Sequence, residues 1–146
     1  MRLRIFSVGK TKESYAKEAV KKYMRLIMPL ADIEMTEIKE QKDKPVDVML
    51  GEEGRKIIKM TSGYMLLDER GRSFTSVEFA SMLCGLSQAD FVLGGAYGVS
   101  DEVRKGAKAL ISLSPMTLTH DMARVLLLEQ LYRALMINAG RKGYHH

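Results

Sequence analysis

The first half of the chain changes twice between strand and helix spacing of its apolar residues. Residues 3–8 are a short apolar-rich run closed by Gly9, which predicts an opening strand. Residues 13–28 carry apolar side chains at helical spacing among lysines. The residues that define this helical stripe are Tyr15, Ala19, Tyr23, Leu26 and Ile27. Period-two alternation over 33–38 predicts a half-buried or edge strand, and a second helix is predicted over 47–60.

The second half contains three short, nearly all-apolar runs, which are typical of strands covered on both faces. These runs are residues 64–68, 90–93 and 109–113, and the loop after the first is predicted to cover 69–72. Thr75 and Glu78 have the spacing of a capping box, which predicts a helix from there to about residue 86. Ser100 or Asp101 caps a short helix that ends near residue 105, and a long helix is predicted over 121–138.

Strands and helices therefore alternate along the whole chain. This order predicts a single α/β domain over residues 1–146, with a mostly parallel sheet and helices on both faces. Ligands of such sheets bind beyond the carboxyl ends of the strands. Three segments are predicted to lie there, namely residues 67–71, 94–98 and 113–118.

Composition narrows the class of protein. Hydrophobic residues make up 46% of the chain and charged residues 28%, which is typical of a soluble globular protein. We find neither a transmembrane run nor a signal peptide, and Cys84 is the single cysteine, so we expect a cytoplasmic protein without disulfides. With three histidines, two of them terminal, a metal enzyme is not expected.

The charge favours an anionic partner. The net charge is +5 and the isoelectric point about 9.3. Such a balance suits nucleic acid, but it also occurs in proteins that are merely basic.

The glycines Gly94, Gly95 and Gly98 follow one predicted strand and precede a helix. Leu93 stands where the dinucleotide-binding pattern has its first glycine, and no Lys-Ser/Thr pair follows, so this is neither that pattern nor a phosphate loop. The cluster predicts either a cofactor turn or a plain tight turn.

The segment 113–118 is apolar, yet Pro115 prevents a regular central strand there. An irregular apolar segment is expected to bury its side chains while its backbone groups find partners. The edge of an adenine ring offers such partners, so the segment suits a nucleoside; a buried connection is the other interpretation.

The last helix predicts burial on two sides, because residues 125–128 are all apolar. A partner subunit is one candidate for its second side. Arg124 shares a stripe with leucines of this helix, one turn after His120, and an arginine there must be paired or bind an anion. Glu129 and Arg133 are predicted to form a structural ion pair.

The tail combines cations with an aromatic ring and two imidazoles. Arg141, Lys142 and Tyr144 suit a phosphate backbone and a stacked base, and His145 and His146 carry the two imidazoles. A frayed terminus, or an expression tag at the two histidines, is the alternative.

Taken together, these motifs resemble the ribosomal RNA large subunit methyltransferase H family along the whole chain. The resemblance rests on Leu3-x-Ile5-x-Ser7-Val8-Gly9-Lys10, Leu67-Asp68 with Gly71, Leu93-Gly94-Gly95-x-x-Gly98, Leu113-Ser114-x-Met116-Thr117-Leu118-x-His120, the run from Arg124 to Ala134, and Tyr144-His145. Thr119 and Asp121, on either side of His120, depart from the family pattern.

The resemblance implies a SPOUT fold with a C-terminal trefoil knot, a homodimer, and S-adenosylmethionine as cofactor. It also implies methylation of N3 of a pseudouridine in helix 69 of 23S rRNA on the assembled 70S ribosome, without a metal or a membrane. The family's cofactor site maps here onto Leu67, Gly94, Leu113, Ser114, Pro115, Met116, Thr117 and Leu118.

Roles for the remaining candidates follow as hypotheses. His120 or His145 accepts the proton of the imide or orients the base, and Arg124 binds a phosphate or a base carbonyl. The basic face of the first helix and the tail grip rRNA near the cofactor of the other subunit. The residues of this RNA surface are Lys17, Lys21, Lys22, Arg25, Arg141, Lys142 and Tyr144.

Two other classes of function stay open on sequence alone. One is a non-catalytic module that binds ribosomes or RNA with the same fold. The other is a flavodoxin-like enzyme that binds a different nucleotide, which the missing phosphate-loop pattern disfavours.

Overall fold

The computed structural model describes residues 1–144, which form alternating strands and helices. The strands are β1 (Arg2–Val8), β2 (Asp32–Ile38), β3 (Tyr64–Ser73), β4 (Gln88–Leu93) and β5 (Ala109–Ser112). The helices are α1 (Ser14–Ile27), α2 (Val46–Met60), α3 (Ser76–Leu83), α4 (Asp101–Gly106) and α5 (His120–Asn138). Within these residues, no helix combines the length and apolar character needed to cross a membrane.

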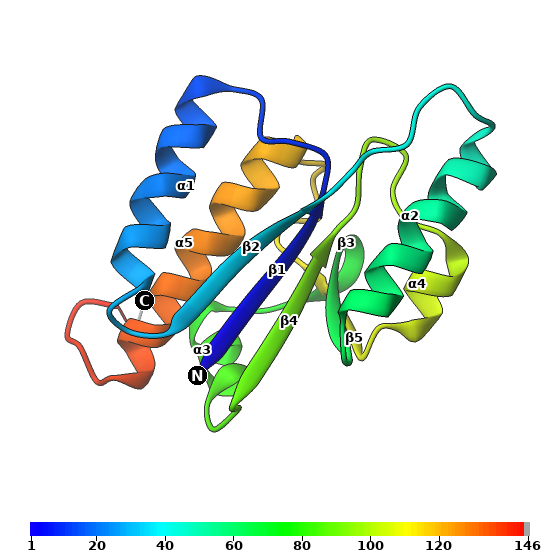
Figure 1. Cartoon of the computed structure of the whole chain (residues 1–146). Helices are drawn as coiled ribbons and strands as arrows, with labels where there is room; N and C mark the ends of the chain where they lie inside the picture. Colours follow the sequence, from blue (N-terminus) through cyan, green and yellow to red (C-terminus); the bar gives the residue numbers. More distant parts are fainter. Residues whose placement is uncertain (145–146) are drawn as a thin grey trace.

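The strands form one parallel sheet in the order β2-β1-β4-β3-β5. Helices α1, α3 and α5 cover one face, and α2 and α4 cover the other (Figure 1). The predicted parallel α/β sheet with helices on both faces is confirmed.

Both faces of the sheet are core, which explains the near-continuous apolar runs in the central strands. Successive residues of a strand point to opposite faces. In β1, Leu3 and Ile5 pack under α1, α3 and α5, whereas Phe6 and Val8 pack under α2 and α4. A polar residue at one of these positions would therefore have to be paired, and Ser7 is paired by a side chain described below.

Caps fix where the helices begin. The side chain of Thr75 accepts a hydrogen bond from the Glu78 amide, and the Glu78 carboxylate accepts one from the Thr75 amide. The predicted capping box is therefore confirmed. Ser100 caps α4, as predicted. The third helix ends at Leu83, three residues before the predicted end, and its chain leaves through Gly85 at a φ of +82°.

The prediction of a loop over 69–72 is wrong, because β3 continues to Ser73. A bulge interrupts the strand, so that Leu67 and Arg72 both lie opposite Ile111 of β5. Gly71 crosses β5 closely: a Cβ on Gly71 would lie 2.5 Å from the carbonyl carbon of Leu110. No local pattern reports such a crossing, because it depends on a strand almost forty residues away. Whether the chain is knotted stays a prediction from the family resemblance.

The predicted inner stripe of α1 is also partly wrong. Ala16 and Ile27 are buried against the core, with Val20 packed beside them. Tyr15 is 54% exposed and Leu26 37% exposed, on the outside of the helix. Apolar residues stand on more than one face of this helix, so spacing alone does not select the face that meets the sheet.

Candidate functional site

A pocket of about 400 Å³ lies beside residues 67–70 of β3 and beyond the ends of β4 and β5, at the three segments that the sequence singles out. We call it the strand-end pocket. It is lined by Leu67, Asp68, Glu69, Arg70, Leu93, Gly94, Gly95, Tyr97, Gly98, Val99, Arg104, Ile111, Leu113, Ser114, Met116, Thr117, Leu118, His120 and Ala123. Its volume lies within the range of about 300–1,000 Å³ that is usual for small-molecule sites.

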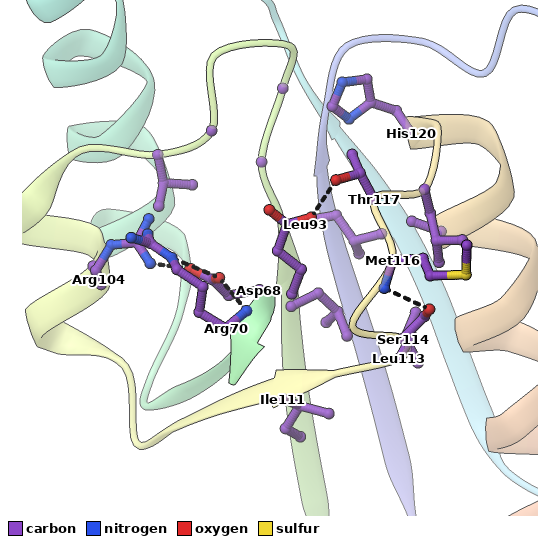
Figure 2. Close-up of a pocket in the computed structure, with 18 of the residues that line it drawn as sticks. Asp68, Arg70, Leu93, Arg104, Ile111, Leu113, Ser114, Met116, Thr117 and His120 are labelled. Carbon is purple, nitrogen blue, oxygen red and sulfur yellow. Dashed lines mark hydrogen bonds and ion pairs between the residues drawn. The ribbon is translucent and has the colours of Figure 1, made fainter. Parts of the chain in front are cut away.

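The structure brings most of the predicted cofactor residues together in this pocket. Leu67, Gly94, Leu113, Ser114, Met116, Thr117 and Leu118 all line it, whereas Pro115 does not. The expectation that segment 113–118 is buried is wrong, since Met116 is 76% exposed, and Leu113, Ser114 and Leu118 are only half-buried. The segment turns on itself, with the Met116 amide donating to Ser114 Oγ at 3.0 Å (Figure 2). Its leucines thus form a pocket wall instead of core.

The opposite wall is charged, and of its charged residues the sequence analysis missed Arg104. Asp68 accepts hydrogen bonds from the Arg70 amide and from Arg104 of α4 (Figure 2). Thr117 Oγ1 donates to Glu69 Oε2 at 2.6 Å, which joins the two walls. Asp68, Glu69 and Arg70 lie in a segment that the sequence marks as a strand edge. Arg104 gives no local signal, because only the packing of α4 brings it to β3.

The glycines form the predicted tight turn, and this turn also lines the strand-end pocket, so a cofactor role stays a prediction. The Gly98 amide donates to the Gly95 carbonyl at 2.9 Å, and Gly98 has a φ of +80°, so a tight turn is present. A Cβ on Gly94 would lie 2.8 Å from the Gly98 carbonyl oxygen. The turn therefore requires a glycine at position 94, and the same turn forms a wall of the strand-end pocket.

A second hollow of about 250 Å³ adjoins the strand-end pocket, with Gly95 and His120 lining both. We call it the loop hollow, because the loop between β1 and α1 forms one side. It is lined by Val8, Gly9, Lys10, Lys12, Glu13, Tyr15, Glu40, Gly95, Ala96, Thr119, His120, Asp121 and Arg124. His120, the exposed first residue of α5, thus stands between the two hollows (Figure 2).

Arg124 lies beside the loop hollow, but its guanidinium is fully engaged. Its side chain is 2% exposed. Its N–H groups donate to Ser7 Oγ, to the carbonyls of Val8, Gly9 and Lys10, and to Asp121 Oδ1. An arginine has five N–H donors, and all five are used here. In this arrangement Arg124 positions the loop that follows β1, and it has no donor left for a phosphate or a base carbonyl.

Asp121 completes this contact from α5 to the loop. Its carboxylate accepts hydrogen bonds from the amides of Lys12 and Glu13, at 3.2 and 2.8 Å. Burial raises the pKa of Asp121, but these amides and the Arg124 charge outweigh it and hold the pKa below its ordinary value. The ionised form therefore holds the loop.

The predicted RNA surface lies away from the strand-end pocket of the same chain. Lys21, Lys22 and Arg25 are exposed along α1, and Arg141 and Lys142 are exposed beyond α5. Tyr144 packs edge-on against Tyr132, with ring centroids 5.9 Å apart. His145 lies outside the described residues. Twelve residues of helix separate His120 from Tyr132, a rise of about 18 Å, so the tail does not approach its own pocket along α5.

Comparison with known proteins places this geometry in a family. The family described as "Predicted SPOUT methyltransferase" matches residues 1–145. Ribosomal RNA large subunit methyltransferase H from Thermodesulfovibrio yellowstonii is 42% identical over 149 residues, covering 99% of both chains. The protein of the same name from Geobacter sulfurreducens is 40% identical over 154 residues, covering 100% of both. The chain belongs to the ribosomal RNA large subunit methyltransferase H family.

Solved structures share the SPOUT fold of this family. A methyltransferase from Legionella pneumophila, solved in complex with the cofactor S-adenosylmethionine, superimposes with a TM-score of 0.56 at 11% identity, covering 92% of this chain and 66% of that one. A methylase family protein from Haemophilus influenzae superimposes with a TM-score of 0.55 at 15% identity, covering 97% of this chain and 67% of that one. The chain thus spans about two thirds of the length of these more distant proteins.

The two positions that depart from the family pattern around His120 have structural roles here. Thr119 caps α5, accepting a hydrogen bond from the Met122 amide, and α5 begins at His120, one residue before the predicted start. Asp121 holds the loop after β1, as described above. Both substitutions therefore support the element that carries His120.

Proposed function

We propose that this protein transfers a methyl group from S-adenosylmethionine to N3 of a pseudouridine in helix 69 of 23S rRNA, acting on the assembled 70S ribosome in the cytoplasm. Membership in the ribosomal RNA large subunit methyltransferase H family supports the reaction class and the large-subunit RNA. The strand-end pocket, which gathers seven of the eight predicted cofactor residues, is the observation that carries the proposal.

The pocket fits the chemistry of this cofactor. Leucine and isoleucine side chains from three strand ends, Leu67, Ile111 and Leu113 among them, provide an apolar wall for an adenine ring. The wall with Asp68, Glu69, Arg70 and Arg104 carries charges of both signs. Such a wall suits a ligand that has a sulfonium, an ammonium and a carboxylate.

The protein's own residues have to bring the target base beside the pocket and remove its proton. Bound S-adenosylmethionine supplies an electrophilic methyl group. N3 of the base gains this methyl and loses one proton, so a proton acceptor beside the base accelerates the step. His120 stands between the strand-end pocket and the loop hollow and is positioned for this role. Holding N3 of the base in line with the methyl group that it attacks also accelerates the reaction.

Arg124 acts indirectly in this mechanism. Because its five donors hold the loop after β1, it fixes one side of the hollow next to His120. His145, which the sequence makes a second candidate acceptor, and the basic residues of α1 and of the tail contribute from the partner subunit of a homodimer.

Apolar surface supports the homodimer. Leu26 on α1 and Met116 and Tyr97 at the pocket are exposed in the single chain. Along α5, Val125 is half-buried in the single chain, which leaves it a side for a partner. Exposed apolar side chains of this size next to a ligand site are typical of interfaces.

The cofactor assignment is tested by calorimetric titration with S-adenosylmethionine on the unaltered protein and on Leu118→Trp. Leu118 is half-buried in the pocket wall, so an indole there occupies the cavity. We expect binding in the micromolar range, weakened at least about tenfold by Leu118→Trp, a loss of about 1.4 kcal/mol.

Leu86→Trp is the matched control. Leu86 is 42% exposed and lies beyond α3, before β4 begins, so the same change there leaves the pocket intact. Equal affinity of all three proteins, with unchanged thermal unfolding, would place the cofactor elsewhere. Gly94→Val is a poorer test, because it disrupts the turn at Gly98 whether or not the cofactor touches it.

A further inference from the structure

A third cavity of about 530 Å³ adjoins the loop hollow, and we call it the lysine cleft. It is lined by Gly9, Lys10, Thr11, Lys12, Lys17, Glu37, Lys39, Glu40 and Lys42. Gly9, Lys10, Lys12 and Glu40 line both. Gly95 and His120 line both the loop hollow and the strand-end pocket, so the three cavities adjoin one another in a row along the carboxyl edge of the sheet, and we call this row the trough.

The lysine cleft is strongly cationic and its charges are available. Five lysines line it against two glutamates. All five lysines are exposed, and none forms an ion pair with another residue of the described chain, 1–144. By contrast, Lys44, two residues after Lys42, is paired with Glu52. Clustered, unpaired cations along a groove are the electrostatic pattern of a phosphate-backbone site.

The backbone that carries two of these lysines is held rigidly. The Lys10 carbonyl accepts from Arg124 at 2.9 Å, and the Lys12 amide donates to Asp121 at 3.2 Å. Both partners belong to the first two turns of α5, the helix that begins at His120. The backbone at Lys10 and Lys12 is therefore fixed relative to the strand-end pocket, as a binding site for a substrate requires.

We propose that the RNA strand carrying the target nucleotide lies along this trough, with its phosphates on the lysine cleft and the target base in the loop hollow. This rests on the proposed function, and it adds a substrate site within one subunit to the RNA surface on α1 and the tail. An enzyme that modifies a base takes it out of its stack into a pocket. Tyr15, 54% exposed, lines the loop hollow and offers a ring for stacking.

The phosphate contact is tested with the double variant Lys39→Ala/Lys42→Ala. The matched control, Lys59→Ala/Lys105→Ala, removes two equally exposed lysines from the last turns of α2 and α4, outside all three cavities. A fluorophore on the exposed Cys84 reports binding to 70S ribosomes by anisotropy at several potassium chloride concentrations. Titration with S-adenosylmethionine without ribosomes checks the cofactor pocket separately.

We expect the cleft variant to bind ribosomes roughly tenfold more weakly and to lower the slope of log affinity against log salt by about one to two, because two phosphate contacts are lost. The control stays close to the unaltered protein. Equal losses in both variants would overturn the cleft as a specific site. No ribosome binding by the unaltered protein, with cofactor binding intact, would contradict the RNA part of the proposed function and this inference with it.

Two variants of Tyr15 test whether the target base lies in the loop hollow. Tyr15→Ala is expected to weaken ribosome binding roughly tenfold by loss of a stacked ring, and Tyr15→Phe to preserve it. If both substitutions leave binding unchanged, the base does not stack in the loop hollow.

Discussion

At the scale of single residues, buried charges decide what a side chain can do. Sequence alone leaves Arg124 with two roles, pairing or anion binding. Its five engaged donors now assign it to pairing. Removing an arginine from water is costly unless every donor finds an acceptor, and the three successive carbonyls after β1 provide most of them. The cation that binds substrate therefore has to come from elsewhere, and the unpaired lysines nearby are the candidates.

Asp90 is another buried charge, and it lies near the start of the central strand β4. It accepts two hydrogen bonds from the Arg4 guanidinium and one from the Ser62 amide. We expect Asp90→Asn to lower the free energy of unfolding by about 2–3 kcal/mol, because Arg4, 17% exposed, loses its charged partner. Asp32 forms an exposed ion pair with Arg2, so Asp32→Asn should change the free energy of unfolding by less than about 0.5 kcal/mol. Urea unfolding of both variants measures the difference.

The contribution of Asp90 should also depend on pH. Burial raises its pKa, but Arg4 and the Ser62 and Gln88 donors outweigh this and lower the pKa below 3.8. A carboxyl whose pKa is lower in the folded state stabilises the fold fully at pH values above its ordinary pKa. This stabilisation is lost as the pH falls through the lowered pKa. The deficit of Asp90→Asn should therefore be full at about pH 7 and shrink as the pH falls from the ordinary pKa through the lowered one. A deficit that stays constant down to pH 2 would exclude this ionisation as its cause.

At the scale of elements, the sequence predicts what is local and misses what is decided by distant contacts. The capping box at Thr75 and the turn at Gly98 depend on a few neighbouring residues, and both are predicted. The extension of β3 to Ser73 depends on β5, and the outward face of Tyr15 depends on which side of α1 meets the sheet. For the same reason the strand ends of the site are predictable, whereas Arg104, brought in by α4, is not.

The crossing of β3 over β5 makes Gly71 the most demanding glycine of the fold. A Cβ there would lie within 2.5–2.7 Å of backbone atoms of Leu110 and Ile111, and backbone cannot move aside as a flexible side chain can. We expect Gly71→Ala to lower the free energy of unfolding by about 3 kcal/mol. Gly85→Ala, with a φ of +82° and no neighbour within 4 Å, should cost only about 1 kcal/mol of backbone strain. Denaturant unfolding of the pair tests this; equal losses would mean that the crossing can relax.

At the scale of the whole molecule, the question is how one small chain brings its tail to its pocket. His120 opens α5 and Asn138 closes it, so about 28 Å of helix separate the pocket from the tail. Figure 1 shows residues 139–144, drawn in red, at the end of α5 away from its first residue, His120. If the tail residues Arg141, Lys142 and His145 take part in the reaction, they have to come from a second subunit.

Mixing two inactive variants tests this arrangement. One subunit carries Leu118→Trp, which blocks its pocket and keeps its tail; the other has Arg141, Lys142 and His145 replaced by alanine, which keeps its pocket. In a dimer that pairs each pocket with the partner's tail, a mixed dimer regains one complete site. Random exchange makes half of the dimers mixed, so we expect methyl transfer to ribosomes to recover to about a quarter of the unaltered level.

A tail that serves its own pocket predicts a different result, since no subunit in the mixture has both parts intact. Activity would then remain at the level of the two variants measured separately. Mixing each variant with itself through the same unfolding and refolding steps controls for losses during exchange. Because the readout is a gain of activity, a merely destabilising effect of either change cannot imitate it, and recovery establishes a site shared between two subunits.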